Sequence, residues 1–214
     1  MGRTGVMLAF VAATTATLAA FEATLDPASL AEAILTGQGT SDATRANFHG
    51  PYHFNVGMAP VDDIEIVTPF RRIVLDAESH ARAGDRAYGQ RLALATLGDD
   101  PSRVDIVAEL TFHPLNTYIG MPDFAVTLIP QAGDPIQPRT IGRLARFGPK
   151  LGMPLPYPYT TGTPQTPGKQ PLQGGMVVAT FDGKALDAKG VYVVMVTGRE
   201  GDAAKARVDF GKLR

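Results

Sequence analysis

Alternation of apolar and polar residues with a period of two is the feature that most restricts the fold of this chain. It is clearest over 103–113, where one face carries Val104, Ile106, Ala108, Leu110 and Phe112. Further strand-like runs occupy 61–67, 91–97, 124–129, 176–181, 191–197 and 205–210. The run 124–129 is apolar on both faces, which predicts a central strand. Together these runs predict a mainly β chain of antiparallel sheets.

A turn and a tyrosine near the C-terminus narrow the fold further. Asp187 and Gly190 mark a turn directly before the 191–197 run, and Tyr192 stands at the start of that run. This pattern resembles the tyrosine corner of immunoglobulin-like domains, in which the phenol oxygen hydrogen-bonds back to the preceding loop. The resemblance covers only this end of the chain, names no substrate, and implies an immunoglobulin-like β-sandwich over 61–214.

One helix is predicted inside this sandwich, over 69–83. Thr68 and Pro69 supply an N-cap and a first helical residue. An apolar stripe follows, formed by Phe70, Ile73, Val74, Ala77 and Ala81. We expect the stripe to pack on the sheet and the charged residues Arg71, Asp76, Glu78 and Arg82 to face water. A second, short helix is predicted over 140–147.

Residues 21–60 are predicted to form a helical and extended N-terminal arm. Asp26 and Pro27 begin a helix that ends near Gly37, and a further helical turn precedes the break at Gly50 and Pro51. Since an exposed strand edge invites association with other chains, we expect this arm to cover an edge or an open face of the sheet.

Residues 1–20 have the pattern of a secretory signal peptide. Arg3 precedes an apolar stretch from Val6 to Ala20, and Thr17 and Ala19 are the small residues that a cleavage site needs. This predicts an exported protein, periplasmic or secreted, with no transmembrane helix once the signal is removed. The alternative is an N-terminal helix that belongs to the folded domain.

Composition excludes several classes of function. The chain has no cysteine, which removes disulfides, thiolate nucleophiles and cysteine-ligated metals. Its formal net charge is −1, so no global basic field is present to attract nucleic acid. With 44% hydrophobic residues it can form a sizeable core.

The long Pro- and Gly-rich segment 131–175 is the first candidate for a binding site. Loops of this length in compact domains are usually functional or mobile. Pro156, Tyr157, Pro158 and Tyr159 favour a polyproline II conformation that suits contact with a protein partner. The alternative is a loop that packs its own aromatic rings on the sandwich.

Three histidines form the second candidate site. His49 and His53 flank a turn, and His113 could join them. Asp62, Asp63 or Asp123 would then supply a carboxylate. Such a set would hold zinc or another divalent metal. The alternative is that the histidines make structural hydrogen bonds to loop carbonyls.

The sequence holds no recognisable catalytic signature. No serine lies in a Gly-x-Ser-x-Gly turn, and the glycine pair at Gly37 and Gly39 lacks a βαβ setting. We therefore expect a non-catalytic binding or structural module of the cell envelope or secreted fraction, without a cofactor. The alternative is a metal-binding protein or metal-dependent enzyme that uses the histidines.

Overall fold

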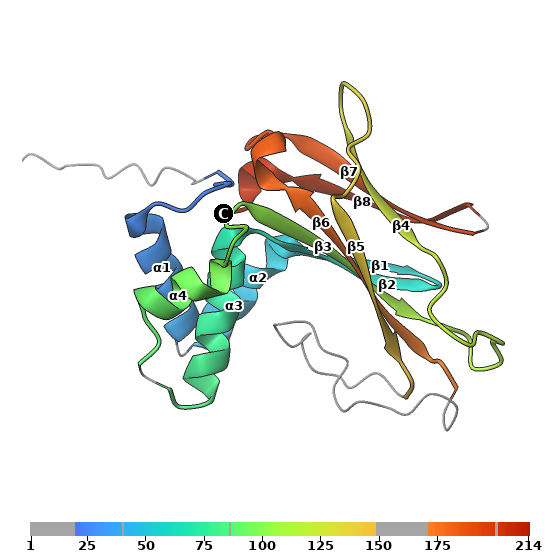
Figure 1. Ribbon diagram of the computed structural model, residues 1–214, viewed down its shortest axis with the longest axis horizontal. Helices are drawn as coiled ribbons and strands as arrows, with labels where there is room; N and C mark the ends of the chain where they lie inside the picture. Colours follow the sequence, from blue (N-terminus) through green and yellow to red (C-terminus); the bar gives the residue numbers. More distant parts are fainter. Residues whose placement is uncertain (1–19, 40, 86, 149–170, 200) are drawn as a thin grey trace, which may run out of the picture.

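Two antiparallel β-sheets extend from a group of helices at one end of the molecule (Figure 1). The computed structural model describes residues 20–39, 41–85, 87–148, 171–199 and 201–214. The chain is mainly β, with 36% strand and 30% helix, and its two sheets are compatible with a β-sandwich.

The larger sheet has five strands and the smaller has three, all antiparallel to their neighbours. In spatial order the larger contains β1 (His53–Met58), β2 (Val61–Val67), β3 (Arg103–Thr111), β6 (Gly174–Asp182) and β5 (Thr140–Arg146). The smaller contains β4 (Ala125–Pro130), β7 (Val191–Gly198) and β8 (Gly201–Asp209).

Side chains from both sheets form one apolar core. In the larger sheet Ile106 lies opposite Ile66 and Ala179, and in the smaller sheet Val194 lies opposite Leu128. All five side chains are fully buried in the same cluster. The apolar face predicted for β3 is therefore the core face, as its period-two pattern required.

The hydrogen bond predicted for the tyrosine at the start of β7 is confirmed. The Tyr192 hydroxyl accepts a 2.8 Å hydrogen bond from the backbone N–H of Asp187 in the preceding loop. Its ring packs edge-on against Phe210, with 5.3 Å between ring centroids. The Tyr192 side chain therefore holds the start of β7 against both the preceding loop and the core.

Four α-helices lie among the described residues, and three of them pack on one another. They are α1 (Pro27–Gln38), α2 (Asp42–His49), α3 (Pro69–Arg82) and α4 (Gln90–Leu97). The predicted starts of α1 and α3 are confirmed, because Asp26 accepts a hydrogen bond from the Ser29 N–H and Thr68 accepts one from the Arg71 N–H.

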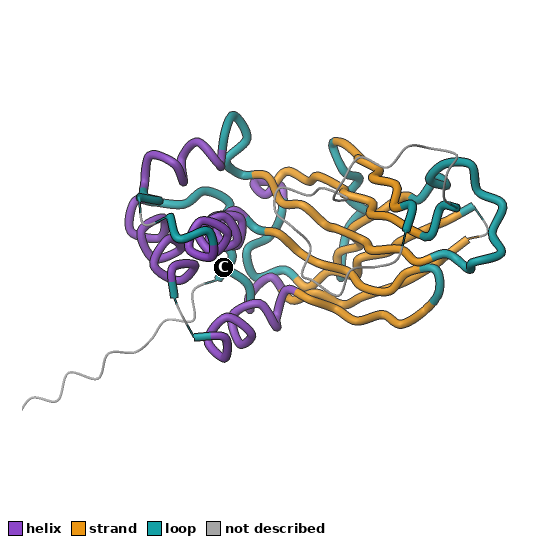
Figure 2. Tube along the Cα trace, turned by 90° about the horizontal axis from the view of Figure 1, so that it is seen from below, coloured by secondary structure: helices purple, strands orange, loops and turns teal. Residues whose placement is uncertain are grey.

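The helices form a second apolar core beyond the ends of the strands (Figures 1 and 2). Ile73 and Val74 of α3 pack with Leu30 and Ile34 of α1 and with Ala93 of α4. One prediction was therefore wrong: the stripe of α3 packs on α1 and α4 and not on the sheet. Within the predicted arm 21–60, strand β1 pairs with β2 at the edge of the larger sheet, whereas α1 packs on α3. The apolar faces of α1, α3 and α4 pack on one another.

Two further predictions about single elements were wrong, and a third element is more regular than expected. Residues 91–97 are helical in α4, and its buried residues Ala93 and Leu97 are spaced i, i+4. The strand prediction failed because a short apolar run fits both the helical and the strand period. Residues 140–146 are strand β5, paired with β6, and they interrupt the predicted 131–175 loop. The arm also contains strand β1, which the sequence marked only as extended.

Strand β4 lies at the edge of the smaller sheet and is not central as predicted. Its outer edge is covered locally, because Leu128 exchanges backbone hydrogen bonds of 3.1 and 2.7 Å with Ile136. Its outward-facing Thr127 is also buried. The run 124–129 is therefore apolar on both faces because the chain that follows β4 covers this strand, and not because the strand is central.

The close approach of α1 to α3 gives the first testable prediction. A Cβ added at Gly37 would lie 2.4 Å from the Val74 carbonyl oxygen and 2.6 Å from the Ala77 Cβ. Overpacking of about 1–3 kcal/mol should outweigh the gain of up to about 1 kcal/mol in helix propensity. We expect Gly37→Ala to lower the free energy of unfolding, measured by urea titration with circular dichroism.

Gly50→Ala is the matched control, because an added Cβ there meets no atom within 4 Å. Its free energy of unfolding should be unchanged or slightly raised. If Gly37→Ala proves as stable as the wild type, the helices do not meet at this glycine.

Candidate functional site

His49, the first predicted metal ligand, is part of a charged network between α2 and α3. Its Nε2 lies 2.8 Å from Oε1 of Glu78, and its Nδ1 accepts a 3.3 Å hydrogen bond from Nε of Arg71. Both ring nitrogens therefore face partners within the protein, and these partners are side chains of α3 and not the loop carbonyls that the structural alternative named.

The other two histidines lie in different surroundings. His53 Nε2 is 3.5 Å from a carboxylate oxygen of Asp63, and His113 Nδ1 accepts a 3.2 Å hydrogen bond from the Leu115 N–H. Within the described ranges, which contain all three histidines, no three His, Asp or Glu side chains are grouped to hold a metal ion. The zinc site predicted at His49, His53 and His113 gains no support from this geometry and stays a prediction.

Two residues that were expected to face water are buried, and sequence reasoning missed their role. Arg71 is 2% exposed and Glu78 is 3% exposed. Arg71 donates a 2.5 Å hydrogen bond to the Ile66 carbonyl at the end of β2 and pairs with Glu65. Its guanidinium also lies 4.9 Å from the centre of the Tyr52 ring. Arg71 therefore joins α3 to β2.

Adjacent groups extend this joint between helices and sheet. Arg72, fully buried, donates to the Arg103 carbonyl at the start of β3. Tyr52 is also buried, and this burial raises the pKa of its phenol above the ordinary value. The network binds elements of this chain to one another, which is a structural function.

A different surface lies at the end of the sheets farthest from the helices (Figure 1). The β1–β2 turn, the β3–β4 loop and the β7–β8 turn meet there, because β1, β3 and β7 all run away from the helices. The Thr111 N–H donates a 2.9 Å hydrogen bond to the Pro60 carbonyl, which links the last residue of β3 to the β1–β2 turn.

The β3–β4 loop is held by its own side chains. The ring of Phe112 contacts Tyr118 edge-on, with 5.0 Å between centroids. The side-chain amide of Asn116 donates to the carbonyls of His113 and Leu172 at 2.7 and 2.8 Å. These contacts set the positions from which the neighbouring side chains project.

Four large side chains on this end face solvent, and we call them the distal surface. Met58 is 60% exposed, Leu115 84%, Tyr118 49% and Ile119 96%. They make up four of the six exposed large hydrophobic residues among those described. A concentration of apolar side chains in water is typical of an interaction site.

The predicted partner-binding residues Pro156, Tyr157, Pro158 and Tyr159 lie outside the described residues. The described residues on either side of their segment are at the distal end. The Gln173 N–H donates to the Arg146 carbonyl, and the Phe112 N–H donates to the Gln173 carbonyl, both at 2.9 Å. The segment therefore leaves and re-enters the sheet beside the β3–β4 loop.

The sequence reasoning did not single out the distal surface. Leu115, Tyr118 and Ile119 have the helical spacing i, i+3, i+4, but Pro114 and Gly120 confine them to a segment too short to predict a helix. The available signal was three large apolar residues between turn-forming residues, with only His113 and Asp123 as titratable neighbours in the loop.

Comparison with known proteins gives no relative: no family model matches the chain, and neither a curated protein nor a solved structure is significantly similar to it.

The buried joint gives the second prediction. Arg71→Met leaves Glu65 and the Ile66 carbonyl without their guanidinium partner, so we expect a loss of about 3–5 kcal/mol in the free energy of unfolding. Lys205→Met is the control, since Lys205 pairs with Asp202 and their side chains are 56% and 51% exposed. It should cost about 0–1 kcal/mol.

Urea titration at neutral pH measures both variants. Equal stability of the two would contradict a joint at Arg71.

Proposed function

We propose that this protein is an exported, non-catalytic binding module of the cell envelope or secreted fraction that holds a protein partner at its distal surface. The observation that carries the proposal is the exposure of Met58, Leu115, Tyr118 and Ile119 at one end of the sheets. The segment with Pro156, Tyr157, Pro158 and Tyr159 is attached at the same end and is proposed to extend this contact.

The chemistry of the β3–β4 loop favours a protein over a lipid surface. Peripheral membrane segments usually combine apolar side chains with lysine or arginine that attract anionic lipids. Between Phe112 and Phe124 the chain has no lysine or arginine. A partner with an apolar pocket matches Leu115 and Ile119, and the half-exposed ring of Tyr118 suits the centre of a protein interface.

We propose further that the sandwich is immunoglobulin-like. The hydrogen bond from Asp187 to Tyr192 supports this, together with loops gathered at the ends of two antiparallel sheets. Such domains commonly present binding loops on a rigid scaffold.

The burial of Phe21, just after the predicted signal peptide, supports a cleavage point that precedes it, after Ala19. Phe21 is 3% exposed, and its ring centroid lies 5.2 Å from that of Phe210. Cleavage after Ala19 would leave Ala20 as the first residue and keep Phe21 in the core. None of the described helices has the length and apolar character needed to cross a bilayer.

The distal surface is tested by the double variant Leu115→Asp with Ile119→Asp. Tagged protein is incubated with an envelope extract of the source organism, and captured proteins are quantified by mass spectrometry. We expect capture of the specific partner to fall at least about tenfold, because two carboxylates would have to be desolvated in an apolar pocket.

Leu35→Asp with Leu94→Asp is the matched control. Both leucines are exposed, at 69% and 53%, but they lie on helices at the opposite end. Capture should survive in this variant. If the distal double variant and the control double variant capture the partner equally well, the proposal of binding at the distal surface is wrong.

Export is tested by expressing the full chain in a bacterial host and measuring the intact mass of the extracytoplasmic protein. The expected mass is that of a chain beginning at Ala20. Ala19→Arg, which removes the small residue before the cleavage point, should give uncleaved protein. Recovery of the wild-type chain in the cytoplasm with residues 1–19 attached would assign those residues to another role.

A further inference from the structure

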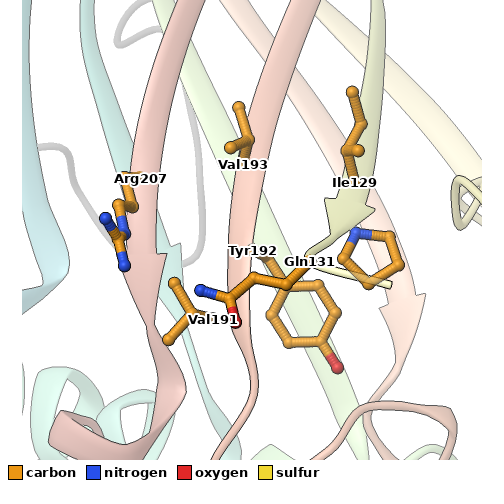
Figure 3. Close-up of a pocket in the computed structure, with 7 residues that line it drawn as sticks. Ile129, Gln131, Val191, Tyr192, Val193 and Arg207 are labelled. Carbon is orange, nitrogen blue, oxygen red and sulfur yellow. The ribbon is translucent and has the colours of Figure 1, made fainter. Parts of the chain in front are cut away.

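A small pocket lies on the outer face of the smaller sheet, near the start of β7 (Figure 3). Its volume is about 230 Å³, and it is lined by Ile129, Pro130, Gln131, Val191, Tyr192, Val193 and Arg207. It is separate from the distal surface, because β7 enters beside the helices and ends at the distal loops.

The floor of the pocket is apolar, and its position follows from strand register. Val193 of β7 lies opposite Ile129 of β4 on one side and Arg207 of β8 on the other. Residues paired in this way project from the same face of the sheet. The floor therefore presents branched apolar side chains beside the stem of an arginine.

The rim of the pocket carries one cation and one amide. In Figure 3 the Arg207 guanidinium and the Gln131 side-chain amide both lie on the side of Val191. Neither the Arg207 side chain nor the Gln131 side chain makes a hydrogen bond or an ion pair with another residue in the described part of the chain. By contrast Lys205, two residues earlier on the same strand and face, is paired with Asp202 at 2.6 Å.

We propose that this pocket binds a small carboxylate that carries a short branched apolar group. A guanidinium receives a carboxylate through two parallel hydrogen bonds, and an adjacent amide N–H can donate a third. The volume is below the range of about 300–1,000 Å³ typical of drug-sized ligands, which restricts the apolar group to roughly four to six carbons. This site goes beyond the protein contact proposed above and does not depend on it.

Methyl-labelled protein titrated with 4-methylpentanoate tests the site. Shifts should appear at the methyl groups of Ile129, Val191 and Val193 and fit a dissociation constant on the order of 1 mM, as expected of a fragment-sized ligand. The neutral isostere 4-methylpentanamide, which cannot form the ion pair, should bind the wild type at least about tenfold more weakly.

Arg207→Gln should weaken binding of 4-methylpentanoate by a similar factor, whereas Lys205→Gln, which removes a paired cation from the same strand, should leave it unchanged. N-acetyl-leucine distinguishes two sources of the ligand. Binding at least as tight as that of 4-methylpentanoate, with the same dependence on Arg207, would support the site and assign it to the C-terminal residue of a peptide.

Weaker binding of N-acetyl-leucine would support the site and assign it to a free branched-chain acid. The proposal is overturned if the methyl groups do not shift up to about 20 mM, a range that covers millimolar affinity. It is also overturned if the amide binds as well as the acid, or if Arg207→Gln binds as well as the wild type.

Discussion

Two buried arginines at the start of α3 determine how the helices and sheets of this protein are joined. Arg71 and Arg72 lie in the first turn of the helix, where the macrodipole disfavours cations, and both are removed from water. The compensation comes from outside the helix, since the guanidinium groups bind carbonyl oxygens of Ile66 and Arg103 and the carboxylate of Glu65. Because these carbonyls belong to the ends of β2 and β3, α3 is held at that end of the larger sheet.

The placement of α3 decides what the rest of the molecule exposes. Once α3 is fixed beyond the strand ends, α1 and α4 bury their apolar faces on it and build a second core there. None of the described helices lies at the opposite end of the sheets (Figure 2). Leu115 and Ile119 lie at that end, on a loop whose geometry is set by Asn116 and Phe112. The helical end is thus held together by its own contacts, and the distal end is the one that we propose binds a partner.

The sequence predicted elements whose signals are local and missed those that depend on tertiary contacts. Six of the seven predicted strands, the caps of α1 and α3 and the hydrogen bond of Tyr192 follow from short patterns and were confirmed. The sequence of residues 91–97 fits a helix and a strand equally well, and packing against α3 decides in favour of the helix. The burial of Arg71 depends on carbonyls that the chain brings near only after folding. In the distal surface, Leu115, Tyr118 and Ile119 have a helical spacing over a segment too short for a helix, so only its composition could have suggested an exposed site.

Strand β7 shows how one local pattern serves both the core and the proposed ligand pocket. Tyr192 and Val194 point into the core, and the hydroxyl of Tyr192 accepts a hydrogen bond from the Asp187 N–H. The alternate residues Val191 and Val193 point outward and line the pocket. A one-residue slip of β7 would exchange the two sets, so the register that packs the core also positions the pocket floor. Substitutions at the outward positions can therefore alter ligand binding with little effect on the core, and selection can act on the two faces separately.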